Sequence, residues 1–131
     1  MELSLEKVVQ AIKKATDNKF EVFKDDVEKE ELKELDSFII YHPYGKLRRA
    51  EKGEYSQEFY LIFVTTESIN FFEDYVFKLI RELQKLSIIF DESDHDIAKM
   101  KNTGDNAELF TMDFHRQLQC AAGIGWTKAN G

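Results

Sequence analysis

The residues best suited to chemistry lie in one acidic segment near position 90. Aspartate, glutamate and histidine fill five of six consecutive positions there: Asp91, Glu92, Asp94, His95 and Asp96. Several carboxylates close together are what hard cations such as Ca²⁺ prefer, so the segment is a candidate metal site. It lacks the Asp-x-Asp-x-Asp-Gly order of a calcium loop, and alternate residues of an extended strand point to opposite faces. We therefore expect a solvated turn between two strands, with no metal ion.

The three histidines and the single cysteine form no catalytic grouping. His42, His95 and His115 lie in separate segments, and none has the spacing of a ligand pair. Cys120 and His115 are five positions apart on one predicted strand, which places their side chains on opposite faces and excludes a nucleophile and base pair. Gly123-Ile-Gly125 has neither a third glycine nor a following helix to complete a nucleotide-binding motif. We expect no catalytic residue, no cofactor and no enzymatic activity.

A short basic segment, residues 46–52, contrasts with an otherwise acidic chain. The chain carries a formal net charge of −7, so general affinity for nucleic acid is not expected. Four of its eighteen Lys and Arg residues nevertheless fall in these seven positions: Lys46, Arg48, Arg49 and Lys52. The segment is either a solvated hairpin loop or an arm that contacts phosphate or an acidic neighbouring subunit.

One strand and the helix after it, residues 54–86, predict the scaffold of the chain. From Phe59 to Thr66 the strand is apolar on both faces, which is typical of a central strand. Asn70–Leu86 predicts an amphipathic helix capped by its first residue. Its apolar stripe, mostly at spacings of three and four, comprises Phe72, Tyr75, Val76, Leu79, Leu83 and Leu86. Phe71 and Phe77 fall outside this stripe, so we expect them to be candidate apolar interface residues.

The remaining elements complete a mixed pattern of helices and strands. We predict a helix over Leu5–Thr16 capped by Ser4, a short strand over Phe20–Phe23, and a solvated loop or weak helix over Lys24–Asp36. A strand over Phe38–Tyr41 is expected to form a hairpin with the central strand, and Phe110–Cys120 is expected to be a half-buried strand. The expected fold is α+β: a single mixed, mainly antiparallel sheet of about four to five strands, with two helices packed on one face. Residues 1–120 would form one domain, and residues 121–131 a flexible tail containing Trp126.

The composition is that of a single soluble domain. A chain of 131 residues, 43% of them hydrophobic, can form one core. The lone cysteine cannot form an internal disulfide, which suits a reducing cytoplasm. No apolar run approaches the roughly 18 residues that span a bilayer, and the first residues lack the pattern of a signal peptide.

The order of the predicted elements carries a family resemblance. It rests on the succession Phe38–Tyr41, Tyr55–Thr66, Asn70–Leu86 and Phe110–Leu118, and it covers the chain from Leu3 to about Cys120. This order resembles that of the tail terminator proteins (minor capsid or tail-completion proteins) of long-tailed bacteriophages. No signature peptide supports it, and the last eleven residues have no counterpart.

The resemblance implies a non-enzymatic virion protein, encoded by a phage or prophage. Such a protein assembles in the cytoplasm of the bacterial host into a homo-oligomeric ring, usually a hexamer, on the last ring of the tail-tube protein. In the virion tail the ring stops tube growth and presents a surface to the head-completion protein. Lys46, Arg48, Arg49 and Lys52 would then contact a neighbouring subunit or the DNA that passes through the lumen.

One alternative comes from a different functional class. A small acidic protein-binding module, such as an immunity protein or nuclease inhibitor, would use its acidic run Asp25–Asp36 to bind a basic partner. A module of this kind is expected to be a monomer in isolation, whereas the ring hypothesis predicts self-association.

Overall fold

The computed structural model describes residues 3–25, 36–99, 106–121 and 125–128 of the chain. Its elements, in chain order, are α1 (Leu5–Ala15), β1 (Glu21–Lys24), β2 (Ser37–His42), β3 (Leu47–Arg49), β4 (Glu54–Thr65), the π-helical turn η1 (Phe72–Val76), α3 (Phe77–Gln84), β5 (Ile89–Lys99), β6 (Asn106–Ala121) and β7 (Gly125–Lys128). The acidic run between Asp25 and Asp36, predicted as a loop or weak helix, lies outside the described residues except at its two ends.

The first helix, α1, has the boundaries that its cap predicts. The Ser4 side chain accepts a hydrogen bond from the backbone N–H of Lys7 at 3.4 Å, which satisfies one of the free donors at the helix start. The buried residues of α1 recur at spacings of three and four, as a helix on the surface of a core requires: Val8, Ala11, Ile12 and Ala15. The chain leaves the helix through Asp17 and Asn18, which both have a positive φ.

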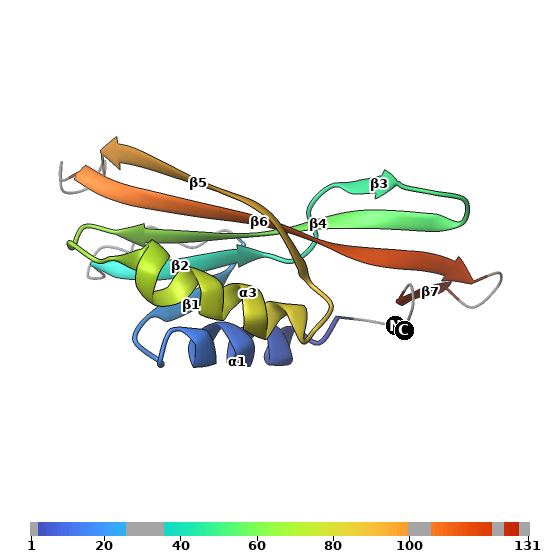
Figure 1. Ribbon diagram of the computed structural model, residues 1–131, viewed down its shortest axis with the longest axis horizontal. Helices are drawn as coiled ribbons and strands as arrows, with labels where there is room; N and C mark the ends of the chain where they lie inside the picture. Colours follow the sequence, from blue (N-terminus) through green and yellow to red (C-terminus); the bar gives the residue numbers. More distant parts are fainter. Residues whose placement is uncertain (1–2, 26–35, 100–105, 122–124, 129–131) are drawn as a thin grey trace.

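All strands belong to one mixed sheet with the order β1-β2-β4-β6-β5. β1 is parallel to β2, and the other pairs are antiparallel. Within the described residues two short strands lie off this path, β3 beside β4 and β7 beside β6. Both helices lie on the same face of the sheet (Figure 1). The structure confirms the predicted α+β fold and the central position of the strand that is apolar on both faces.

The central pair of strands, β4 and β6, is longer than the helix layer. Their ladder runs from Glu54 opposite Gln119 to Thr65 opposite Glu108. At one end of this ladder β3 pairs with the outer side of β4, and β7 pairs with the outer side of β6. This end of the sheet extends past α1 and α3 (Figure 1). We call residues 46–57, which comprise β3, the following turn and the first residues of β4, the hairpin arm. The loop predicted for residues 46–52 is therefore in part a strand.

The main core lies between the sheet and the two helices. Its aromatic centre is Phe63 of β4, whose ring stacks on that of Phe71 with centroids 4.2 Å apart. The opposite face of the sheet carries a smaller apolar cluster around Phe38, Val64 and Ala107. This second cluster accounts for the apolar character of β4 on both faces, because its residues alternate with those that face the helices.

A π-helical turn changes which aromatic residues of the second helix are buried. Phe71 is fully buried, whereas Phe72 is 52% exposed. The prediction that Phe71 lies at an interface is therefore wrong, and so is the assignment of Phe72 to the core stripe. The cause is η1, whose wider turn shifts the helical register by about one residue. The helical segment begins at Phe71, directly after the predicted cap Asn70, whose backbone carbonyl accepts a hydrogen bond from Asp74 N at 2.9 Å.

The segments after the second helix differ from the prediction in two places. The acidic residues 91–96 do not form a turn, because they lie inside the eleven-residue strand β5. Part of the predicted C-terminal tail forms β7, which pairs with the end of β6. Among the described residues, no helix has the length and apolar character needed to cross a membrane.

Candidate assembly surfaces

The acidic segment forms the outer edge of the sheet. β5 pairs with β6 on one side only, and a bulge between Phe90 and Glu92 interrupts the ladder. Glu92, Asp94 and Asp96 make no ion pair within the described part of the chain. Charges along an unpaired strand discourage non-specific pairing with other sheets, so this composition is consistent with an edge strand.

These carboxylates increase the negative potential of the sheet face that the helices leave open. Glu92 lies opposite Asp113 of β6, and partners in a ladder share a face. Burial raises the pKa of Asp113, and the negative charges of Glu92, Glu58, Asp91 and Asp94 raise it further. The acidic edge is therefore self-repelling, and a cationic partner would stabilise it.

The acidic edge does not assemble a metal site within the described residues. No three His, Cys, Asp or Glu side chains there are grouped closely enough to hold an ion. Alternation along β5 places Glu92, Asp94 and Asp96 on the open face of the sheet, and Ser93 and His95 on the face of the helices.

Each histidine contacts a carboxylate. His115 Nδ1 lies 2.7 Å from Asp91 Oδ1, across the pair of strands β6 and β5. His42 Nδ1 lies 3.3 Å from Asp25 Oδ1, and His95 Nε2 lies 3.3 Å from Glu108 Oε1. The side chain of Cys120 lies outside the described residues. These contacts link neighbouring segments of the fold.

The hairpin arm is attached to the sheet by a tight backbone contact. Gly45 N donates to Glu58 O at 2.8 Å, and Glu58 N donates to Lys46 O at 2.9 Å. A Cβ atom at Gly45 would lie 2.8 Å from Glu58 O, so this close approach requires glycine. At the tip Gly53 has a φ of 76°, which closes the turn between β3 and β4.

A half-buried cation, Arg116 of β6, supports the arm. Arg116 donates from Nη2 to Gln57 Oε1 at 2.9 Å, and its guanidinium lies 5.8 Å from the centre of the Tyr44 ring. Burial lowers the pKa of Arg116, but its high ordinary value keeps it charged. The side chain that interrupts the apolar alternation of this strand therefore fixes the base of the arm.

The arm presents basic and apolar side chains to solvent. Lys46, Arg48, Arg49 and Lys52 are all exposed, and so is Leu47, at 46%. Arg48 lies 3.5 Å from Glu58, whereas the other three cations have no ion-pair partner among the described residues. Leu47 and Arg49 point to the same side of β3, because they are two positions apart on a strand. The arm thus carries unpaired positive charge beside an exposed leucine.

An exposed aromatic pair and a groove lie at the other end of the sheet. The rings of Phe72 and Phe77 meet edge to face with centroids 5.6 Å apart, and Phe77 is 65% exposed. Residues five apart do not face each other on an α-helix, so the π-helical turn brings this pair together. Beside Phe72 lies a groove of about 390 Å³ between η1 and the strands β5 and β6. Its lining residues are Phe72, Val76, Ser93, Asp94, His95, Phe110 and Met112.

One wall of the groove is held in place by a stacked pair. The His95 ring lies on the Phe110 ring with centroids 4.4 Å apart and an interplanar angle of 13°. His95 also contacts Glu108, which lies on the same strand as Phe110. The groove therefore has apolar walls, and Ser93 and His95 are the residues of β5 whose side chains face it.

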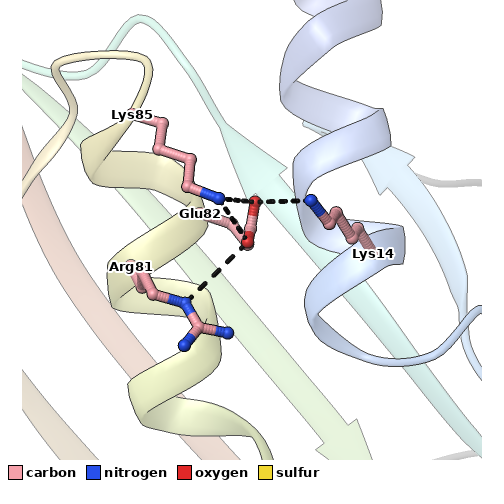
Figure 2. A network of polar contacts seen from close by, with 4 residues as sticks. All are labelled: Lys14, Arg81, Glu82 and Lys85. Carbon is pink, nitrogen blue, oxygen red and sulfur yellow. Dashed lines mark hydrogen bonds and ion pairs between the residues drawn. The ribbon is translucent and has the colours of Figure 1, made fainter.

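The helix layer is fixed by an ionic cluster at its outer surface (Figure 2). Glu82 of α3 is only 6% exposed, and its carboxylate is 3.0 Å from Lys85 Nζ, 3.7 Å from Lys14 Nζ and 3.9 Å from Arg81 Nε. The hydrogen bond from Lys85 lowers the pKa of Glu82, and the charges of the nearby cations lower it further. Lys14 belongs to α1, so the cluster joins the two helices that form one wall of the molecule.

The structure thus places the sequence candidates at two opposite ends of the sheet. Lys46, Arg48, Arg49 and Lys52 lie on the hairpin arm, Phe77 lies near the groove, and Phe71 lies in the core. Six residues of β4 separate Gln57 at the arm from Phe63 beside the groove, which is about 20 Å along a strand. Phe72 and the groove were missed, because a π-helical turn has no recognisable sequence signal.

Comparison of the sequence with the models of known protein families and with curated proteins found no match.

Proposed function

We propose that this chain is a non-enzymatic structural subunit that associates head to tail into a closed ring. The observation that carries the proposal is the separation of complementary charges. Counting only the described residues, cations without an ion-pair partner lie on the hairpin arm at one end of the sheet, and carboxylates without one lie on β5, whose ladder with β6 extends to the other end. Complementary charges of this kind guide association and fix the orientation of the partners.

The positions of the two charged surfaces permit a head-to-tail contact. Surfaces at opposite ends of a molecule allow a head-to-tail contact, in which one end of each copy binds the other end of the next. Contacts of this kind build a ring when the rotation between copies closes. The exposed Phe72 and Phe77 add apolar area near the second surface, and aromatic residues of this type are enriched at interfaces.

Within this class we propose a tail terminator of a phage or prophage. The support is the order of the elements that resembles this family, together with the two complementary ends. As such a protein, the chain would form a ring, expected to be a hexamer, on the end of the tail tube in the virion, after assembly in the host cytoplasm. The ring would stop tube growth and bind the head-completion protein, and its basic residues could contact the DNA that passes through.

A genetic experiment tests this proposal in the phage or prophage that carries the gene. A stop codon early in the gene should give tails of uncontrolled length that do not join to heads, and supplying the protein in trans should restore normal particles. Electron microscopy of the lysate measures both properties. Tails of normal length attached to heads would refute the proposal.

One observation favours the alternative of a small acidic binding module. The unpaired carboxylates of β5 form an acidic strip that a basic protein could bind. This alternative predicts a monomer that inhibits a cationic enzyme in a salt-sensitive manner. Measuring the solution mass of the purified protein separates the two hypotheses.

A further inference from the structure

We infer that the free edge of β5 is the docking site for an extended segment of a basic partner protein, in which basic and apolar residues alternate. The segment would continue the sheet as a further strand beside β5. This inference goes beyond the proposed ring, because it assigns a partner protein to a strand edge and not a contact between copies.

Within the described residues β5 is the last strand of the sheet, so one of its sides carries unpaired backbone groups. Their direction follows from the ladders, because the backbone groups of an antiparallel strand point alternately to its two sides. Glu58 N donates to Lys46 O on the β3 side, so Phe63, an odd number of residues further along β4, directs its groups toward β6. Its partner Phe110 therefore bonds to β4, and His95, opposite Phe110, directs its N–H and C=O away from β6. The residues two positions before and after His95 do the same.

Two aspartates cap these outward donors. Asp94 Oδ1 accepts a hydrogen bond from His95 N at 2.9 Å, and Asp96 Oδ1 accepts one from Ile97 N at 2.7 Å. A strand added at this edge would bring carbonyl oxygens to the same N–H groups and displace both carboxylates. Lysine or arginine side chains of that strand would pair with the displaced carboxylates, whereas a neutral or acidic strand would leave them without a partner. The edge therefore discriminates against other strands and accepts a basic one.

The two faces of β5 require different side chains from the added strand. On the open face of the sheet, Asp94 and Asp96 make no ion pair within the described part of the chain. On the face of the helices Ile97 is 62% exposed, and the groove beside Phe72 runs along the same face. Side chains of a strand alternate between its faces, so alternating basic and apolar residues would meet carboxylates on one face and apolar surface on the other. Strand addition gains affinity from backbone hydrogen bonds and specificity from such alternate contacts.

The pattern of charges assigns the edge to another protein. The basic strand of this chain, β3, has only the three residues Leu47–Arg49. Its adjacent residues Arg48 and Arg49 point to opposite faces, so β3 does not separate basic from apolar side chains. A segment that places its cations on one face must therefore come from a different chain.

A synthetic peptide of alternating lysine and valine is the probe, and fluorescence anisotropy measures its binding to the whole chain. Two control peptides keep the same side chains: one groups the lysines at one end, and the other has methylated backbone nitrogens that donate no hydrogen bond. Asp94→Lys combined with Asp96→Lys is the edge variant. Glu6→Lys combined with Glu51→Lys is the matched control, because all four carboxylates are exposed and the change in charge is the same. Thermal unfolding should show that both proteins remain folded.

The alternating peptide should bind to the wild type and slow hydrogen exchange at the amides of His95 and Ile97. Binding should weaken by about tenfold or more for both control peptides and for the edge variant, and should be unchanged for the matched control. No binding of the alternating peptide, equal binding of either control peptide, or an edge variant that binds as well as the matched control would overturn the inference. Slow exchange at these amides that increases with protein concentration in the absence of peptide would also overturn it, because a second copy would then occupy the edge. The mass of the free protein tests the ring separately.

Discussion

Replacing Phe71 by alanine should destabilise the protein far more than replacing its neighbour Phe72. Phe71 is fully buried, and its ring centroid lies 4.2 Å from that of Phe63, 5.2 Å from that of Phe110 and 5.9 Å from that of Tyr75. Phe72 is 52% exposed and contacts the ring of Phe77, which is 65% exposed. The two substitutions remove the same atoms from adjacent positions, so each is the control for the other.

The expected difference follows from burial. Truncating a buried phenylalanine to alanine costs about 3–5 kcal/mol, because it removes apolar burial and leaves a cavity. For a chain of this length each kcal/mol lowers the Tm by about 3–4 °C, so Phe71→Ala should lower it by roughly 10–20 °C. Phe72→Ala loses only a partly exposed ring contact and should cost less than about 1 kcal/mol.

Urea unfolding followed by circular dichroism measures both free energies, at a protein concentration low enough that each variant is a monomer. Equal losses for the two variants, or a larger loss for Phe72→Ala, would refute the reasoning. Such a result would mean that the helix keeps a regular α-helical register through residues 72–76 and that Phe72 faces the core.

Three further predictions concern other parts of the molecule. Folding lowers the pKa of Glu82, so its carboxylate stabilises the protein fully at pH values above the ordinary glutamate pKa, and this contribution is lost as the pH falls through the lowered pKa. Glu82→Gln should therefore flatten the pH dependence of the unfolding free energy in that acidic range. Gly45→Ala should cost about 1–3 kcal/mol in urea unfolding, because its Cβ would lie 2.8 Å from Glu58 O; an unchanged stability would show that the base of the arm can shift. Raising the salt concentration should weaken self-association measured by sedimentation, because the two surfaces attract through exposed charges; association that is independent of salt would contradict the role of those charges.

The general architecture could be predicted from periodicity and capping. Ser4 and the apolar spacing after it predict α1, and the apolar character of residues 59–66 on both faces predicts the central position of β4. These features depend on local preference and on burial, which the sequence expresses directly.

The two errors of most consequence arise where tertiary contacts override local pattern. The stack of Phe71 on Phe63 favours the register shift of η1, although the spacing of apolar residues alone predicts a regular helix. The acidic residues of β5 have low strand propensity, yet a long ladder with β6 holds them in a strand. Neither contact can be read from the segment itself, because each partner lies elsewhere in the chain.

The sequence predicts one of the two candidate surfaces, the basic arm, but not the groove. The basic residues 46–52 are visible as a charge reversal in the sequence, and the structure places them on an exposed arm. The groove combines residues from η1, β5 and β6, which are brought together only by the fold.

The solution mass of the purified wild-type protein, measured by light scattering from low micromolar to about millimolar concentration, tests head-to-tail ring formation most directly. We predict one discrete species of several subunits whose mass stops increasing with concentration, about 92 kDa for six copies of the 15.4-kDa chain. A monomer at every concentration and salt condition would contradict ring formation, and a mass that rises without limit would indicate an open filament in place of a ring.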